Sequence, residues 1–236
     1  MTIEEIQVRL RQVADPGDAV TLQWFFKTGP GEYGEGDVFI GVKVPKIRAL
    51  VKEFWKADES IVLQLLASAI HEERFLALMI LVRLFEKGSE ADRRRIFRLY
   101  LARTDRINNW DLVDLSAPNI VGEYLSDKSR RPLYRLVKSP SLWERRIAML
   151  ATFALIRRRE FDDALAMADR LLHDEEDLIH KAVGWMLREI GKRDMGVLET
   201  FLKPRCTVMP RTMLRYAIER FPEARRKRYL RAKYQS

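Results

Sequence analysis

Apolar residues recur at intervals of three and four along almost the whole chain, the spacing that aligns them on one face of an α-helix. Proline, glycine and serine signals such as Asp15-Pro16-Gly17, Gly88-Ser89 and Ser139-Pro140 separate the periodic stretches. Only VFIGVKV at 38–44 could form a short extended piece. The pattern predicts helices at 3–14, 17–28, 45–57, 60–68, 72–87, 89–103, 109–125, 131–138, 141–158, 160–173, 176–192, 194–203, 210–220 and 222–233.

The predicted helices pair off at about forty residues per pair, without a clean sequence repeat. Helix pairs with short connections predict an all-α fold, an α-solenoid of HEAT-like helix pairs. A compact helical bundle is the alternative architecture. No strong boundary interrupts the pattern, so we expect a single domain over residues 1–236 that ends in a basic helical segment at 203–236.

The net positive charge of the chain lies in that basic segment. Residues 203–236 carry eleven Lys and Arg against Glu219 and Glu223, a net charge of +9 that equals the excess of the whole sequence. A basic end of this kind predicts contact with a polyanion. A solvated helix that aids solubility is an equal alternative for the segment taken alone. Acidic lipid is a weaker one, because the segment lacks a broad apolar face.

Several protein classes find little support in the sequence. No apolar run reaches the length of about 18 residues that a membrane span needs, and the start, MTIEEIQVRLRQV, does not resemble a secretory signal. The single cysteine, Cys206, excludes an internal disulfide and suits a reducing cytoplasm. The three histidines His71, His173 and His180 are too few and badly spaced for a zinc site, so we expect no metal. No nucleophile elbow is present.

The glycine cluster GPGEYGEGD at 29–37 does not match a phosphate-binding loop. It lacks the Gly-Lys-Ser/Thr of a P-loop, and Glu32, Glu35 and Asp37 would repel phosphate. We expect a flexible loop here.

Trp185 lies away from the apolar stripe of its own helix. Ile179, Val183, Met186 and Ile190 form that stripe on the helix predicted at 176–192, and Trp185 falls roughly 120° from it on a helical wheel, beside Lys181 and Arg188. Packing against a neighbouring helix would explain such a ring. The flanking cations favour a ring that meets a ligand.

Arg146 raises the opposite question, because its helix is apolar nearly all round. A buried arginine without a partner is costly, so it must meet an acid or line a polar groove. An ion pair with Asp111 or Glu189 is one interpretation. The other is contact with a phosphate or with the lesion side in a concave groove.

Trp110 and Asp114 lie four residues apart in NNWDLVDLS, so a helix places them on one face. A helix start would explain part of this segment, with Asn108 or Asn109 as cap and Asp111 near the helix dipole. Asp114 lies further into the helix, on the face of Trp110, so a helix start does not explain it. A carboxylate beside an aromatic ring can stabilise positive charge that develops on a sugar and can orient a water molecule, the needs of an oxocarbenium-like transition state.

Three segments, NWDLVDLSAPNIVGEYL, LWERRIAMLATF and DLIHKAVGWMLREIGKRD, resemble the signature blocks of the AlkD-type DNA alkylation repair proteins, the HEAT-like-repeat DNA glycosylases. FIGVKVPKIRALVK, ERFLALMILVRLF and PRTMLRYAIERF match further blocks in the expected order, so the resemblance covers about residues 5–222.

This resemblance implies a curved solenoid whose concave, positively charged surface holds duplex DNA, and excision of purines alkylated at N3 or N7. It implies that Trp110 contacts the sugar of the lesion, that Asp114 is the catalytic carboxylate, and that Arg146 and Trp185 match the family's arginine and second tryptophan. The damaged base is not flipped into a tight pocket in this family. A monomer in the cytoplasm, acting at the nucleoid, is the expected form.

The chemistry agrees with so sparse a site. A purine alkylated at N3 or N7 is already cationic, so it leaves as a neutral molecule and needs no general acid. No cofactor is required, and the expected product is an abasic site without strand cleavage. From their positions we expect Arg145, Arg146, Lys181, Arg188, Arg211 and Arg215 to bind DNA. The competing class is a non-catalytic helical-repeat scaffold for nucleic acid or protein.

Overall fold

The computed structural model describes residues 1–231 and resolves the chain into two compact helical units, Met1–Ser116 and Ala117–Ser236. Every predicted helix is present among the described residues, and the end of the helix predicted at 222–233 lies outside them. None of the described residues forms a regular strand. The all-α fold is confirmed. That residues 1–236 act as one domain stays a prediction.

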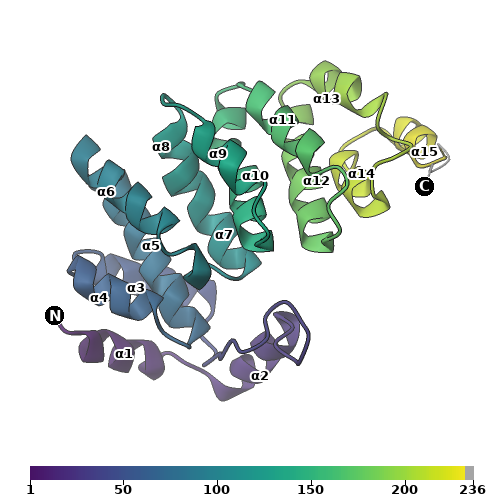
Figure 1. The fold of residues 1–236 in the computed structure, drawn as a ribbon. Helices are drawn as coiled ribbons and strands as arrows, with labels where there is room; N and C mark the ends of the chain where they lie inside the picture. Colours follow the sequence, from purple (N-terminus) through teal and green to yellow (C-terminus); the bar gives the residue numbers. More distant parts are fainter. Residues whose placement is uncertain (232–236) are drawn as a thin grey trace. The chain divides into compact units, whose positions relative to one another are not determined.

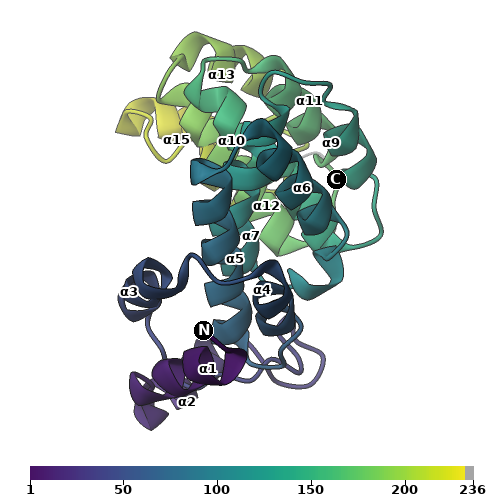
Figure 2. The same cartoon turned by 90° about the vertical axis from the view of Figure 1, so that its left-hand side faces the viewer.

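The first unit is built on α5 (His71–Lys87), whose 17 residues are buried around most of the helix. Figure 2 shows α5 with α3 (Val44–Phe54) and α4 (Glu59–Leu66) on either side, and both pack against it. The remaining helices of this unit are α1 (Ile3–Gln12), α2 (Pro16–Phe25), α6 (Glu90–Leu101), the 3₁₀ turn η1 (Thr104–Arg106) and most of α7 (Trp110–Ala117).

The second unit is built on α10 (Leu142–Arg157) and α12 (Asp177–Gly191), which pack against each other (Figure 1). Shorter helices cover this pair: η2 (Pro118–Gly122), α8 (Glu123–Leu125), α9 (Arg131–Leu136), α11 (Asp162–Arg170), α13 (Met195–Leu202), α14 (Arg211–Ala217) and α15 (Glu223–Arg231). Pairs of helices with short connections therefore recur, as the sequence pattern predicts.

Several helix starts follow from side-chain caps that are legible in the sequence. Thr2 and Glu5 form a reciprocal capping box at α1, and Ser89 and Asp92 form another at α6. Asp15 caps α2 by accepting the backbone N–H of Asp18, with Pro16 in the first turn.

The helix predicted at 109–125 contains an irregularity that its apolar period conceals. Residues Pro118–Gly122 form a π-helical turn between α7 and α8. Pro118 has no N–H to donate to the helix ladder, and a π turn accommodates such a break. Gly122 lies so close to α10 that a Cβ atom there would be 2.2 Å from the carbonyl oxygen of Ala151.

The segment 38–44 has the short extended piece that its sequence predicts. Val38 forms an isolated parallel bridge with Ile70, and its carbonyl oxygen accepts the backbone N–H of His71 at 2.8 Å. The bridge ties the end of the glycine-rich loop to the start of α5.

Candidate functional site

Trp110 begins α7 and lies at the end of a column of aromatic rings. Its backbone N–H donates to Oδ1 of Asn109 at 2.8 Å. The indole ring is half-buried and stacks on Phe26, with centroids 5.0 Å apart and planes 13° from parallel. Phe25 meets the same indole edge-on at 5.9 Å.

The column continues inward from Phe26 to a histidine. Phe26 stacks on Phe39 at 4.9 Å, and Phe39 stacks on the imidazole of His71 at 4.4 Å. Sequence reasoning missed this arrangement. The pair Phe25-Phe26 just before the glycine-rich loop was the one available signal.

A buried polar cluster surrounds His71 at the inner end of the column. Nδ1 lies 3.1 Å from Oδ2 of Asp37 and Nε2 lies 2.8 Å from Oδ2 of Asp111. Arg74 donates to Oδ1 of Asp37 at 2.6 Å, and the Asn109 amide donates to Oδ2 of Asp37 at 3.1 Å. All five side chains belong to buried residues.

The pKa shifts in this cluster follow from its charges. Burial alone lowers the pKa of His71, but the charge of Asp111 and the hydrogen bonds to both carboxylates outweigh burial and raise the pKa to about 9. Burial raises the pKa of Asp37, whereas its hydrogen bond with His71 and the charge of Arg74 outweigh that effect and lower it. The cluster is therefore charged and balanced at neutral pH.

Asp111 and Asp114 differ in their surroundings although they share α7. Asp111 stands in the first helical turn, is buried and faces His71, in agreement with the salt-bridge or dipole role expected for it. Asp114 is half-buried, one turn beyond Trp110. Burial raises the pKa of Tyr100, and the negative charge of Asp114 raises it further. Asp111 is thus held inside the cluster, while Asp114 retains exposure.

The glycine-rich loop is folded by its own acids. The Glu32 carboxylate accepts the backbone N–H of Gly29 at 3.0 Å, and Glu35 accepts that of Gly31 at 2.9 Å. Asp37 is buried in the cluster with His71. These acids close turns and bury charge in the first unit.

In the second unit, Trp185 lies off the buried stripe of α12, as the helical wheel predicts. The stripe residues Ile179, Val183, Met186 and Ile190 are buried, and Trp185 is half-buried. Its indole N–H donates to Oε1 of Glu189 at 3.4 Å, and its ring centroid lies 6.1 Å from that of Phe153.

Two cations of the second unit hold the Glu189 carboxylate in place. Lys192 and Arg193 pair with it at 2.5 and 3.0 Å. Burial raises the pKa of Glu189, but the hydrogen bonds from Lys192 and Arg193 outweigh burial and lower it. Glu189 is thus an anionic anchor for the indole of Trp185.

The two arginines of α10 are held within the second unit. Arg146 is buried, and its guanidinium donates to the carbonyl oxygen of Leu178. Two acids were considered above as ion-pair partners of Arg146. Of these, Asp111 binds His71 in the first unit, and Glu189 binds Lys192 and Arg193. Arg145 pairs with Asp174 at 2.6 Å and donates to the carbonyl oxygens of Ser139 and Pro140.

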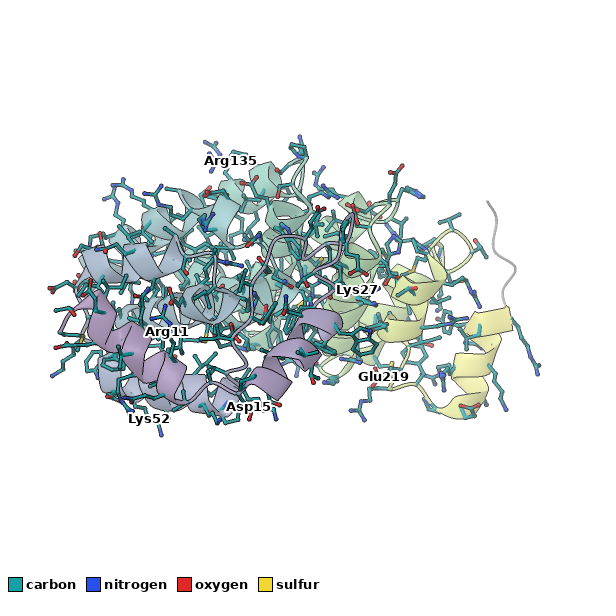
Figure 3. All side chains as sticks on the ribbon, turned by 90° about the horizontal axis from the view of Figure 1, so that it is seen from below. Arg11, Asp15, Lys27, Lys52, Arg135 and Glu219 are labelled. Atoms are coloured by element: carbon teal, nitrogen blue, oxygen red, sulfur yellow. The ribbon has the colours of Figure 1, made fainter. Side chains whose placement is uncertain are left out.

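The other candidate cations have varied surroundings. Lys181 pairs with Asp177 at 2.7 Å, and Arg188 pairs with Glu219, the residue labelled in Figure 3. Arg211 donates to the carbonyl oxygen of Leu230 at 2.6 Å. Arg215 is exposed.

The sequence-predicted residues fall into two groups. Trp110 and Asp114 share α7 in the first unit, whereas Arg145, Arg146, Lys181, Trp185 and Arg188 lie on α10 and α12 of the second. Among residues 1–231, no group of His, Cys, Asp and Glu side chains could hold a metal ion. No helix in the same range is long and apolar enough to cross a membrane.

Solved structures with the same fold are known. A protein described as a predicted DNA alkylation repair enzyme from Enterococcus faecalis is 18% identical, with a TM-score of 0.67 over 89% of this chain and 97% of that one. AlkD2 from Streptococcus mutans is 16% identical, with a TM-score of 0.55 over 87% of this chain and 97% of its own. No curated protein matches the sequence.

The model of one protein family, described as DNA alkylation repair enzyme, matches residues 6–221. The match takes in both compact units and every site residue considered above. The chain therefore belongs to the family of DNA alkylation repair enzymes, with a role in DNA repair.

Proposed function

We propose that the protein is a monofunctional DNA glycosylase that hydrolyses the N-glycosidic bond of cationic N3- and N7-alkylpurines in duplex DNA. One observation carries the proposal: α7 presents a half-buried carboxylate, Asp114, one turn from the half-buried indole of Trp110. The other acid of that helix, Asp111, is buried and bound to His71. A negative charge beside an aromatic ring suits a sugar that becomes cationic as its base departs.

The chain's own residues have a limited task in this reaction. An alkylated cationic purine departs as a neutral base, so the site must stabilise the sugar and orient water. Asp114 supplies negative charge for both purposes, and the face of Trp110 can lie against the sugar cation. Trp185 is proposed as a further catalytic residue. Water then adds to the anomeric carbon, its proton is lost, and an abasic site results.

Cations of the second unit would hold the DNA backbone. Exposed Arg215 and half-exposed Lys181 are the most accessible of the candidates. Arg145 donates to backbone carbonyl oxygens and pairs with Asp174, so it would shape the surface as well as charge it. Arg146 is buried and donates to the carbonyl oxygen of Leu178, so we propose that it supports this surface from within. We propose that the protein acts on duplex DNA as a monomer in the cytoplasm, at the nucleoid, without metal or cofactor.

The test is incubation of the protein with a duplex that carries a single 7-methylguanine. We expect release of the free base and an abasic site that breaks only on later alkaline treatment. A protein that binds this duplex and releases no base would instead be a non-catalytic scaffold.

A further inference from the structure

The His71 side chain is buried between two carboxylates that come from different parts of the first unit. Nδ1 faces Asp37, at the end of the glycine-rich loop, and Nε2 faces Asp111, in the first turn of α7. His71 itself begins α5. One imidazole ring therefore joins three segments that lie far apart in the sequence.

The geometry favours a doubly protonated ring. An ionised carboxylate only accepts hydrogen bonds, so a histidine that bonds to two of them must donate from both nitrogens. A ring with two N–H groups is an imidazolium. Its charge and that of Arg74 balance the charges of Asp37 and Asp111, which makes full burial of the cluster tolerable.

Two routes connect this imidazolium to Trp110. Through Asp111 it holds the residue directly after Trp110. Through the stacked rings of Phe39 and Phe26 it supports the face of the indole itself. Asn109, which accepts the backbone N–H of Trp110, also donates to Asp37 in the same cluster.

We propose that His71, as a buried imidazolium, is a positioning residue for Trp110, clamping the first turn of α7 to the glycine-rich loop. This role in excision rests on the proposed function, but the position of Trp110 can be measured without it. Loss of the proton removes the histidine hydrogen bond from one of the two carboxylates and releases one side of the clamp. The Trp110 indole then moves.

The groups that face His71 determine where this release occurs. They are Asp37 from the loop and Asp111 from α7, each in direct contact with the ring. Arg74, on α5 itself, binds the other oxygen of Asp37. The Glu72 carboxylate accepts the backbone N–H groups of Ile40, Gly41 and Val42. Two acids in direct contact raise the pKa of His71 to about 9, so the clamp holds at neutral pH and opens in alkali.

Two NMR signals test the proposal in DNA-free protein. Protein labelled with ¹⁵N-histidine reports the protonation of His71, assigned with His71→Gln. Protein labelled with 5-fluorotryptophan reports the surroundings of each indole, with Trp110→Phe and Trp185→Phe assigning two of the five signals. Between pH 6.5 and 10 we expect the Trp110 signal to shift together with deprotonation of His71, while the Trp185 signal stays constant.

Two variants make the cause of the shift specific. In Asp111→Asn the loss of one negative charge should move both transitions down by about one pH unit or more. In His71→Gln the Trp110 transition should be absent. If His71→Gln does not fold, Asp111→Asn, which keeps a hydrogen-bonding side chain, still tests the coupling.

Either of two results would overturn the proposal. One is a Trp110 signal that stays constant while His71 loses its proton. The other is a His71 ring that carries a single proton at pH 7. Neither result depends on base release, so an inactive wild-type protein would refute the glycosylase proposal and leave this one standing.

Discussion

Trp110 and Trp185 occupy related but unequal surroundings at the scale of single residues. Trp110 stacks on Phe26 and is linked through Asn109 to a buried ion cluster. Trp185 depends on a long hydrogen bond to Glu189 and on the nearby Phe153 ring. Because Trp185 lies off the buried stripe of α12, its contribution to function can be separated from stability more easily.

Trp185→Phe should reduce single-turnover excision by about tenfold, because a smaller ring offers less surface to the sugar and cannot donate to Glu189. The aromatic packing against Phe153 is retained. We expect the melting temperature to fall by no more than about 2–4 °C, the scale for losing one modest interaction in a protein of this size. Parallel melting and rate measurements check this, and a larger loss of stability would show that Trp185 has mainly a packing role.

The His71 cluster gives stability a defined dependence on pH. The folded-state pKa of about 9 lies above the ordinary value of 6.5, so between these values the folded chain binds more protons than the unfolded chain. The stabilisation is complete below pH 6.5, declines as pH rises, and is lost above about pH 9. Urea unfolding of wild type and His71→Gln across this range should show the difference in unfolding free energy shrinking with pH; a constant difference would contradict it.

At the scale of elements, the sequence predicted every α-helix of the described residues, because apolar period and caps are local signals. The short 3₁₀ turn η1 was not predicted. Thr2, Asp15 and Ser89 mark helix starts within three residues of their partners. The π turn after Pro118 could not be predicted, because the apolar period continues through it. The His71 cluster was missed for another reason: its members lie 34 and 40 residues apart, and only the packing of α5, α7 and the loop brings them together.

The same limit applies to the candidate site. Trp110 and Asp114 could be paired from sequence because they are one helical turn apart. Trp185 and Glu189 in α12 are also four residues apart and form a hydrogen bond. The sequence singled out Trp185 because it lies off the apolar stripe, and it did not indicate this pairing with Glu189. Arg146 donates to the backbone carbonyl of Leu178, and no pattern of side chains could indicate that contact.

Gly122→Ala tests the close packing of η2 against α10. Alanine favours a helix over glycine by about 1 kcal/mol, so an open helical site would gain stability. Here the added Cβ would lie 2.2 Å from the carbonyl oxygen of Ala151, and backbone cannot yield as a flexible side chain can. We expect a net loss of about 1–3 kcal/mol in the free energy of unfolding, measured in urea. A gain would mean that the two helices separate readily.

At the scale of the whole molecule, the distribution of charge remains the feature that most favours a polyanionic partner. The excess lies in residues 203–236, of which the structure describes those up to 231. In α15, Tyr229 packs edge-on against Phe221 at 5.5 Å, which anchors the helix. Arg226 and Lys227 pair with Glu223 at the surface, and such exposed pairs are weak enough for both cations to meet phosphate.

Duplex binding should therefore weaken with salt, and the basic helix should contribute to the slope. The double variant Arg226→Gln, Lys227→Gln leaves Tyr229 in place and should reduce the slope of log K against log salt by about 0.9 for each phosphate that the variant no longer neutralises. Lys52→Gln, an exposed charge on α3 labelled in Figure 3, is the control outside the basic segment. A slope equal to that of wild type would remove the basic helix from the DNA-binding surface.

The most direct test of the proposed chemistry compares the two acids of α7. Asp114→Asn keeps the shape of the side chain and removes the charge opposite the sugar cation, so single-turnover excision of one 7-methylguanine should fall roughly 10²–10³-fold. Asp111→Asn weakens the His71 cluster and should lower stability, with less than about a tenfold effect on the rate at matched folded fraction. A near-normal rate for Asp114→Asn would contradict the assignment of Asp114 as the catalytic carboxylate. If, in addition, Asp111→Asn were inactive, the catalytic charge would belong to Asp111.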